Sequence, residues 1–458
     1  KTVHFVTREI SERKDFFLKM FSIALPVVVQ SLLNNSLSFV DTLMIGQLGE
    51  SSIAAVALAN QMFFLISLLF FGVTSGSAIF LSQYWGARNE TDIQKVLGIS
   101  LSIAGIGALL VALASFFFPR QIMHIFTTEE TVVRIGISYL KIVAVSYLFS
   151  AFSQIMATAL RVIGKAKIPL QVALVSLSLN AVGNYLLIFG IGPFPQWGVA
   201  GAALATAVSR LIEMLALLYI VYRRHPVIAI RSRQAFVWNK KFVLHILPTS
   251  LPVIINEIFW ALGMTTYKIA YSRMGIEAIA AINVAESIGN LFFVVMMGVS
   301  NATLIMIGVK IGEKQVPLAR LYARRFITTA FLVGIGMGMF EFFFAPVFAQ
   351  FFNIRDEVRQ LAIYCLYINA ALLPIKSLNM VIIVGILRSG GDTRYSMFAE
   401  MFGVWAVGVP LAFFGALVLK LNIYQLYLLL GMEEVSKLVL GMYRIKKGTW
   451  VNDLTELH

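Results

Sequence analysis

The sequence predicts an all-α integral membrane protein with twelve transmembrane helices, arranged as two parallel repeats of six helices each. The composition indicates a membrane environment: of the 458 residues, 59% are hydrophobic and 13% are charged, whereas roughly a quarter of the residues in a soluble domain are charged. Segments of about 20 mainly apolar residues recur along the chain, and each can cross a hydrocarbon core of about 30 Å. The alternating strand pattern of an outer-membrane barrel is not found in the sequence.

An internal repeat divides the chain into two halves. When the chain is shifted by 226 positions, Pro26 aligns with Pro252 and Gly86 aligns with Gly312. Further along, the offset is one residue larger, so that Arg161 aligns with Arg388. Internal duplication of a hydrophobic chain is typical of secondary transporters, which bind substrate between two moving repeats. Transport is therefore the leading functional hypothesis.

Each half contains six predicted spans, and an even number returns the chain to the side that it left, which makes the repeats parallel. We place the predicted helices at 17–47, 52–82, 92–118, 130–160, 169–190, 198–222, 243–272, 278–309, 318–344, 356–386, 395–418 and 421–443. The predicted organisation is a cytoplasmic N-terminal segment (1–16), an N-lobe (17–222), a basic cytoplasmic linker (223–242), a C-lobe (243–447) and a cytoplasmic C-terminal tail (448–458).

The basic residues lie mostly on one side of these helices. The positive-inside rule therefore places both termini and the linker in the cytoplasm. Six Lys or Arg residues fall on the other side: Arg120, Arg134, Arg273, Arg355, Arg359 and Lys420. The net charge of +14 thus reflects topology and attraction to anionic lipid headgroups, and we expect no nucleic-acid partner.

The first and seventh predicted helices each carry a proline near the cytoplasmic end, Pro26 and Pro252. Proline removes one backbone hydrogen bond and clashes with the preceding turn, so both helices can bend. A static kink and a moving hinge are both open interpretations.

Asp41 is the candidate coupling residue of the first helix. It is the only acid between Asp15 and Glu50, and a carboxylate at this depth costs roughly 2.5–3.5 kcal/mol on insertion scales. Burial favours the neutral acid, so Asp41 is suited to take up a proton on one side of the membrane and to release it on the other. The alternative is a purely structural carboxyl group that hydrogen-bonds to a neighbouring Asn or Thr.

Polar residues of the fifth and sixth helices form, with Asp41, a candidate cluster in the N-lobe. Asn180 and Asn184 are one helical turn apart and share a face, and Thr206 follows soon after the small pair Gly201-Ala202. The predicted polar and ion cluster consists of Asp41, Asn180, Asn184, Thr206 and Tyr139. The predicted substrate-binding residues are Asp41, Asn34, Leu37, Met44, Asn60 and Phe64. Interhelical packing, at about 0.6 kcal/mol for each polar contact, is the alternative role.

The C-lobe carries four charges that we expect to be buried: Glu257, Lys268, Glu286 and Lys376. Glu257 and Lys268 are about three turns apart on one helix face, too far to touch, so their partners are expected on other helices. These residues are either structural pairs or a second coupling or cation site. Local helix pairs with a packing role are expected between Arg210 and Glu213 and between Lys437 and the acids Glu433 and Glu434.

The sequence contains no catalytic or metal-binding motif. Cys365 stands alone inside a predicted helix, so neither a disulfide framework nor a cysteine metal cluster is expected. Gly164-Lys165 lacks the upstream glycine and the following Ser or Thr of a phosphate-binding loop. The histidines are scattered without ligand spacing: His4, His124, His225, His245 and His458. We therefore expect no enzyme activity, no cofactor, and an ion gradient as the energy source.

The order of several motifs resembles the multidrug and toxic compound extrusion (MATE) family, most closely its bacterial DinF-type members. The resemblance covers about Phe17 to Gly448 and is carried by Leu25-Pro26, Asp41, Gly86-Ala87-Arg88, Leu160–Gly164 and Gly198–Thr206. It implies a V-shaped pair of lobes that exports lipophilic, often cationic compounds by proton or sodium antiport. It also implies that the first-helix acid, here Asp41, couples ion binding to drug release.

Residue by residue, the family's first-lobe ion site corresponds to Asp41, Asn180, Asn184 and Thr206. Sodium-binding members commonly carry a second Asp at the position of Asn184, and the loss of an anionic ligand weakens a hard-cation site. Trp260 and Ser377 stand where vibrio-type members have acids in the second lobe. Both departures favour protons over sodium.

The sequence therefore predicts a proton-coupled multidrug exporter of the bacterial cytoplasmic (inner) membrane, a monomer surrounded by membrane lipids. Lipophilic cationic drugs and protons are expected to compete for Asp41. A sodium-coupled exporter is the nearest alternative. A flippase for lipid-linked oligosaccharides is another, and it would need basic contacts for pyrophosphate in the central cleft, where Lys268 and Lys376 are the candidates.

Overall fold

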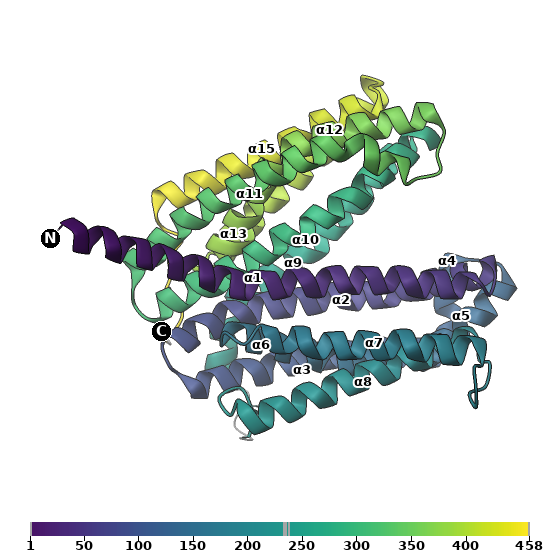
Figure 1. The fold of residues 1–458 in the computed structure, drawn as a ribbon, viewed down its shortest axis with the longest axis horizontal. Helices are drawn as coiled ribbons and strands as arrows, with labels where there is room; N and C mark the ends of the chain where they lie inside the picture. The colour runs from purple at the N-terminus through teal and green to yellow at the C-terminus, as the bar shows by residue number, and fades with distance from the viewer. Residues whose placement is uncertain (1, 232–235, 237–238, 457–458) are drawn as a thin grey trace. The chain divides into compact units, whose positions relative to one another are not determined.

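The computed structural model describes residues 2–231, 236 and 239–456, with side chains from Glu12 onward. Parts of the predicted linker, 232–235 and 237–238, and the terminal positions 1, 457 and 458 lie outside the described residues. Over the described ranges the ordered elements are helices (Figure 1), and the one pairing of the strand type is an isolated antiparallel bridge between Gly391 and Val451. The all-α prediction is therefore confirmed.

The first half of the chain forms the helices labelled α1 to α8 in Figure 1. Their bounds are α1 Thr2–Gly46, α2 Glu50–Gly86, α3 Glu90–Phe117, α4 Pro119–Phe126, α5 Glu130–Val143, α6 Ser146–Val162, α7 Lys167–Phe189 and α8 Val199–Arg224. The second half consists of α9 Lys240–Ser272, α10 Ile276–Gly312, α11 Val316–Gln350, α12 Asp356–Asn379, η2 Met380–Leu387, α13 Thr393–Met401, η3 Phe402–Gly408, α14 Val409–Phe413, η4 Phe414–Val418 and α15 Ile423–Lys447.

Many of these helices are suited to a membrane. Within the described residues, ten are long and apolar enough to cross one, and an eleventh span results if α5 and α6, which meet at a bend of 49°, are taken together. The protein is therefore a multi-pass membrane protein. The predicted span at 421–443 corresponds to α15, which is not among the ten. Its apolar sequence is interrupted by Glu433, Glu434 and Lys437.

The structure departs from the predicted helices at three places. The predicted helix at 130–160 is divided into α5 and α6, which are separated by Ala144 and Val145. The short helix α4 was not expected. The tenth and eleventh predicted helices contain the π-helical segments η2, η3 and η4, in which the backbone hydrogen bonds change register. The prolines Pro26 and Pro252 lie inside the uninterrupted helices α1 and α9.

The chain forms two compact units. One, which we call the N-unit, comprises Val29–Leu81 and Arg88–Leu244. The other, the C-unit, comprises Lys1–Val28, Ser82–Ala87 and His245–His458. The start of α1 and the end of α2 thus belong to the unit that contains the second half of the chain. The division into lobes at the linker stays a prediction.

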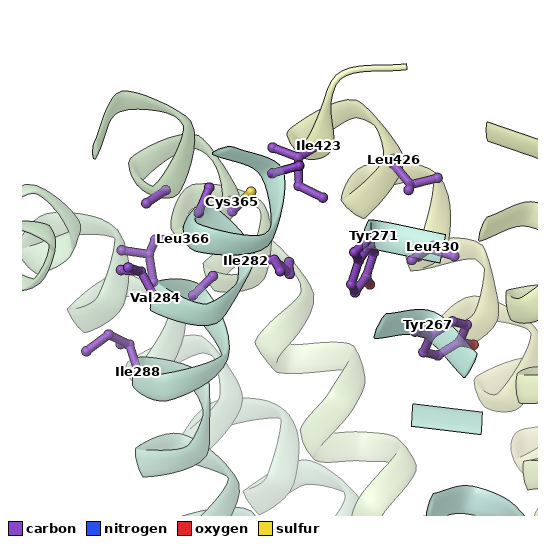
Figure 2. Close-up of a cluster of buried hydrophobic side chains, with 14 of the residues drawn as sticks. Tyr267, Tyr271, Ile282, Val284, Ile288, Cys365, Leu366, Ile423, Leu426 and Leu430 are labelled. Atoms are coloured by element: carbon purple, nitrogen blue, oxygen red, sulfur yellow. The ribbon is translucent and has the colours of Figure 1, made fainter. Parts of the chain in front are cut away.

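The core of the C-unit is a cluster of buried apolar side chains, most of them from α9, α10, α12 and α15, with further members from α11, η3 and α14. Figure 2 shows Tyr267 and Tyr271 of α9 beside Leu430 of α15, while Cys365 of α12 lies nearer to Ile282 of α10. Cys365 is a buried free cysteine, so its thiol serves packing here.

Two glycines allow the C-terminal ends of α2 and α10 to cross closely within the C-unit. A Cβ added at Gly86 would lie 2.1 Å from the carbonyl oxygen of Val309, and one at Gly312 would lie 1.9 Å from the carbonyl oxygen of Gln83. In the alignment of the two repeats, which are 226 positions apart, Gly86 corresponds to Gly312 and Gln83 corresponds to Val309. Each side of this contact is therefore the repeat counterpart of the other.

The described part of the C-terminal tail packs onto the C-unit. Trp450 is 1% exposed. Gln83 of α2 donates from Nε2 to the carbonyl oxygen of Asn452 at 3.1 Å, and its Oε1 accepts from the backbone N–H of Leu454 at 2.8 Å. The His245 Nε2 atom lies 2.9 Å from the carbonyl oxygen of Leu454. The tail thus connects the end of α2 with the start of α9.

Candidate functional site

The candidate site in the N-unit is centred on Asp41, which lies five residues before the end of α1 at Gly46. Its carboxyl group is half-buried and accepts a hydrogen bond at Oδ1 from Asn184 Nδ2 of α7 at 2.6 Å. This distance is short for an N–H···O bond, as is usual when the acceptor is a carboxylate. Asp41 therefore has the Asn partner that its position in an apolar helix requires.

The hydrogen bonds continue from Asn184 to α8. Asn184 Nδ2 lies 3.5 Å from Asn180 Oδ1 one turn earlier, and Asn180 Nδ2 donates to Thr206 Oγ1 at 3.2 Å. Both asparagine side chains are buried. The structure thus brings together four of the five residues predicted for the polar cluster, from three helices.

Small residues bring α7 and α8 close enough for these bonds. A Cβ added at Gly201 would lie 2.5 Å from the carbonyl oxygen of Leu187, and one at Gly183 would lie 3.1 Å from the Cβ of Ala205. Close approach through small residues is the usual way in which helices pack in membranes. At this separation a short Asn side chain reaches the Thr206 hydroxyl.

One acceptor in the cluster has no partner. Asn184 is 1% exposed, and among the described residues its Oδ1 atom finds no hydrogen-bond donor. Leaving a buried polar atom unsatisfied costs about 1–3 kcal/mol. The site is therefore suited to receive one more donor or one positive charge next to the Asp41 carboxyl group.

Tyr139, the fifth predicted member, makes a different contact. Its hydroxyl donates to Asn60 Oδ1 at 3.1 Å and so connects α5 with α2. No hydrogen bond between this pair and Asp41 is found in the described part of the chain. The pair adds a second polar contact to the N-unit without extending the Asp41 network.

The predicted substrate-binding residues lie on two helices. Asn34, Leu37, Asp41 and Met44 recur every three or four residues along α1 and are all half-buried, so they form one stripe of that helix. Asn60 and Phe64 of α2 are exposed. Their role in binding stays a prediction.

Charged residues of the N-unit form two further contacts between or within its helices. Arg210 Nη1 donates to Glu213 Oε2 at 2.8 Å, which confirms the predicted local pair. Arg161 Nη2 donates to Gln30 Oε1 at 3.0 Å and connects α6 with α1. We did not predict the Arg161 contact, although this arginine is part of the repeated Leu-Arg motif.

The charged residues predicted in the C-lobe have the expected interhelical partners, but two of them are not buried. Glu257 is buried and accepts from Arg388 Nη2 at 2.8 Å. Lys268 lies 3.9 Å from Glu286, with side chains 65% and 39% exposed, so the prediction of burial was wrong for this pair. The reason is helical periodicity: Tyr267 forms part of the core, and the next residue along α9 points away from it.

Lys376 belongs to a network that includes an acid we did not predict. Its Nζ donates to Asn369 Oδ1 at 2.7 Å and to the Tyr427 hydroxyl at 3.2 Å, and Asn369 Nδ2 donates to both carboxyl oxygens of Glu341 at 3.0 Å. Lys376 is half-buried and Glu341 is fully buried. Glu341 is the only acid in α11, a signal similar to that of Asp41, which is the only acid between Asp15 and Glu50.

Comparison with known proteins identifies the family. The MatE family model matches residues 26–186 and 252–414, two segments that begin 226 positions apart, as the internal repeat requires. The chain belongs to the MatE family. Most of the sequence takes part in this match, so membership rests on both halves of the chain and not on one motif alone.

Individual relatives of this MatE protein are distant. The chain is 24% identical over 453 residues to the uncharacterized transporter YisQ of Bacillus subtilis, covering 98% of this chain and 99% of YisQ. It is 24% identical over 416 residues to the probable multidrug resistance protein NorM of Bacillus licheniformis, covering 89% of each. The crystal structure of the MATE transporter VcmN of Vibrio cholerae in its bent form has the same fold, with a TM-score of 0.86 at 18% identity over 96% of this chain and 99% of VcmN.

Proposed function

We propose that this MatE protein is a secondary active exporter of lipophilic, cationic small molecules, driven by proton antiport across the bacterial cytoplasmic membrane. The observation that carries the proposal is the hydrogen bond from Asn184 to Asp41 beside the unpartnered Asn184 Oδ1. The names of relatives such as NorM of B. licheniformis, a probable multidrug resistance protein, support drugs as the substrate class. The protein is a transporter and not an enzyme in this proposal, and it uses no cofactor.

The Asp41–Asn184 pair can serve both protonation states of the acid. When Asp41 is ionised, Asn184 Nδ2 donates to one carboxylate oxygen, and the negative charge attracts a cationic drug. When Asp41 takes up a proton from outside, the attraction is lost and the drug is released. The new O–H group is also the donor that Asn184 Oδ1 lacks. Drug and proton then exclude one another, which is the linkage that antiport requires.

The ligand set supports protons over sodium. A hard cation prefers several anionic oxygens, but the cluster offers one carboxylate, two amides and a hydroxyl from Asp41, Asn184, Asn180 and Thr206. A proton needs a single carboxylate with a hydrogen-bonding neighbour. We therefore assign proton coupling to Asp41 and keep sodium coupling as the variant that the experiment below tests.

The proposed topology has twelve spans, both termini in the cytoplasm, and an N-lobe and a C-lobe joined by the linker. Taking α5 and α6 as one bent span and adding α15 to the ten apolar helices gives this number. The charges of α15 are satisfied inside the protein, because Lys437 contacts Glu433, Glu434 and Glu400. We further propose that the exporter acts as a monomer and that it is of the DinF type.

The function can be tested in proteoliposomes with a fluorescent lipophilic cation. An imposed pH gradient in sodium-free buffer is expected to drive the cation against its concentration gradient in the wild type and to fail in Asp41→Asn. Glu130→Gln is the matched control, because it makes the same acid-to-amide change in an exposed pair with Arg120. Export by Asp41→Asn at the wild-type level contradicts the proposal. A strict need for sodium contradicts the proton coupling.

A further inference from the structure

The described residues after α15, 448–456, form a segment of the C-unit that we call the strap. Trp450 fixes its first part, because this side chain is 1% exposed. Asn452 binds to Gly390: its backbone N–H and its Nδ2 both donate to the Gly390 carbonyl oxygen, at 3.0 and 2.8 Å. A Cβ added at Gly390 would lie 2.0 Å from the carbonyl oxygen of Trp450. The strap therefore lies directly on the loop between η2 and α13.

The strap also binds Gln83, in the last turn of α2. Gln83 is fully buried, and its amide group makes three hydrogen bonds. Its Nε2 donates to the carbonyl oxygens of Ser389 at 2.9 Å and Asn452 at 3.1 Å, and its Oε1 accepts from the backbone N–H of Leu454 at 2.8 Å. Two of the three bonds come from the strap. Because a buried amide atom without a partner costs about 1–3 kcal/mol, the strap holds the last turn of α2 in place.

The helix α2 is shared between the two units. It is one uninterrupted helix, yet its residues up to Leu81 belong to the N-unit, whereas Ser82–Ala87 belong to the C-unit. In secondary transporters one repeat moves against the other during transport. Such a movement requires α2 either to bend near Leu81 or to shift its last turn. In both cases the bonds of Gln83, two residues beyond Leu81, are at the point of change.

The part of the strap beyond Trp450 is suited to opening. Residues 451–456 are all half-buried or exposed. Hydrogen bonds and one exposed ion pair hold them, with Lys314 Nζ 2.7 Å from Glu456 Oε1 and side chains 64% and 58% exposed. Segments with few buried apolar contacts open at a much lower free-energy cost than global unfolding. Residues 451–456 can therefore detach while Trp450 stays in the core.

The repeat indicates that this contact has a role beyond building the fold. The close glycine contact of Gly86 and Gly312 is present on both sides of the repeat. Gln83, however, corresponds to Val309, whose apolar side chain neither donates nor accepts a hydrogen bond. The fold of a repeat thus does not require an amide at this position. The bonds between Gln83 and the strap are an addition to the α2 side alone.

We propose that the strap is a cytoplasmic latch on α2, closed in this structure, which has to open in every transport cycle. This inference rests on the proposed export function and on the proposed topology, which places the C-terminal tail in the cytoplasm. While the latch is closed, Gln83 and the last turn of α2 are fixed to the C-unit. When residues 451–456 detach, Gln83 loses two of its three bonds and the end of α2 is free to move with the rest of its helix.

A reversible cross-link tests whether the latch has to open. In a Cys365→Ala background, Lys314→Cys and Glu456→Cys are joined by a cleavable bifunctional thiol reagent before reconstitution. Export of the fluorescent cation is expected to be lost in the linked protein and to return when a reductant cleaves the link. The matched control joins Lys310→Cys with Glu313→Cys, an equally close pair at 2.7 Å that does not involve the strap, and is expected to export in both forms. Equal export by the linked and the cleaved strap overturns the latch.

Hydrogen exchange tests the latch without a transport assay. The backbone N–H groups of Asn452 and Leu454 are expected to exchange faster in Gln83→Leu than in the wild type, and to keep the wild-type rate in Gln154→Leu, where the side chain is exposed. Unchanged exchange in Gln83→Leu overturns the inference.

Should Gln83→Leu not fold, the linked strap replaces it, because linking is expected to slow the exchange of Asn452 and Leu454. Equal rates in the linked and cleaved forms overturn the latch. If the cleaved protein moves no cation, the proposed export fails, and the exchange rates alone decide whether the strap opens.

Discussion

Asn369 shows how one amide can hold a charged network together. Its Nδ2 donates to both oxygens of Glu341, and its Oδ1 accepts from Lys376 and from the Tyr427 hydroxyl. A Leu side chain has about the same size but none of these bonds. Breaking a buried charged network in this way typically lowers the free energy of unfolding by about 3–5 kcal/mol.

We therefore expect Asn369→Leu to lower the free energy of unfolding by about 3 kcal/mol or more, seen as a lower unfolding temperature in detergent. Asn301→Leu is the control, because Asn301 donates only to the carbonyl oxygen of Met297 within its own helix. Equal stability of the two variants would show that Glu341 and Lys376 do not depend on Asn369.

His225 gives a prediction for pH. It follows α8, and its pKa is held below the usual 6.5 by burial and by the positive charges of Lys165 and Arg224. The folded protein therefore favours neutral His225, and the stability from this residue is present above about pH 6.5 and lost as the pH falls through the lowered pKa. Acidification is expected to destabilise the wild type more than His225→Gln. Parallel losses in unfolding temperature would contradict the assignment.

The sequence was sufficient to predict the Asp41 cluster but not the clusters of the C-unit. Asn180 and Asn184 share a face by helical spacing, and Asp41 is conspicuous as a lone acid. Glu341 carries the same signal and was missed. The local pair of Glu434 with Lys437 was predicted from helical spacing. The contact with Asn379 could not be predicted, because Asn379 lies 55 positions away on a helix whose rotation is set by packing.

Among the elements, the crossing of α2 and α10 depends on glycine most directly. The Cβ of Ala at position 312 would lie 1.9 Å from the Gln83 carbonyl oxygen, so the two helices must move apart. Overpacking of this kind costs about 1–3 kcal/mol. Gly312→Ala is therefore expected to lower the unfolding temperature.

Gly105 of α3 provides the opposite case. Nothing lies within 4 Å of a Cβ added there, and Ala is preferred over Gly in helices by about 0.8–1 kcal/mol. Gly105→Ala is expected to leave stability unchanged or to raise it. If Gly312→Ala and Gly105→Ala lowered the unfolding temperature by similar amounts, the effect would come from the helix backbone and not from the close crossing of α2 and α10.

The existence of the long helices could be predicted from hydropathy, but their interruptions could not. Val143 to Ser146, where α5 gives way to α6, contains neither glycine nor proline. The π-helical segments η2, η3 and η4 likewise have no reliable mark in the sequence. The hydropathy pattern from which the helices were predicted contains neither feature.

At the scale of the whole chain, the tail connects residues that are far apart in sequence. Trp450 is 1% exposed, and Gln83 bonds to Asn452 and Leu454. We expect Trp450→Ala to cost about 3–5 kcal/mol and to lower the unfolding temperature. Trp197→Ala, at a side chain 48% exposed, is the control. If both variants unfold like the wild type, the tail does not stabilise the C-unit.

The reciprocal contact of Gly86 and Gln83 with Gly312 and Val309 has a bearing on ancestry. In a homodimer of half-length chains, the same surface would have met its own copy across a twofold axis, which is the isologous geometry of most dimers. Fusion of the two genes would turn that subunit interface into an internal one. The two halves could then diverge independently. This explains how the first half has Asp41 where the second half has Tyr267 at the corresponding position.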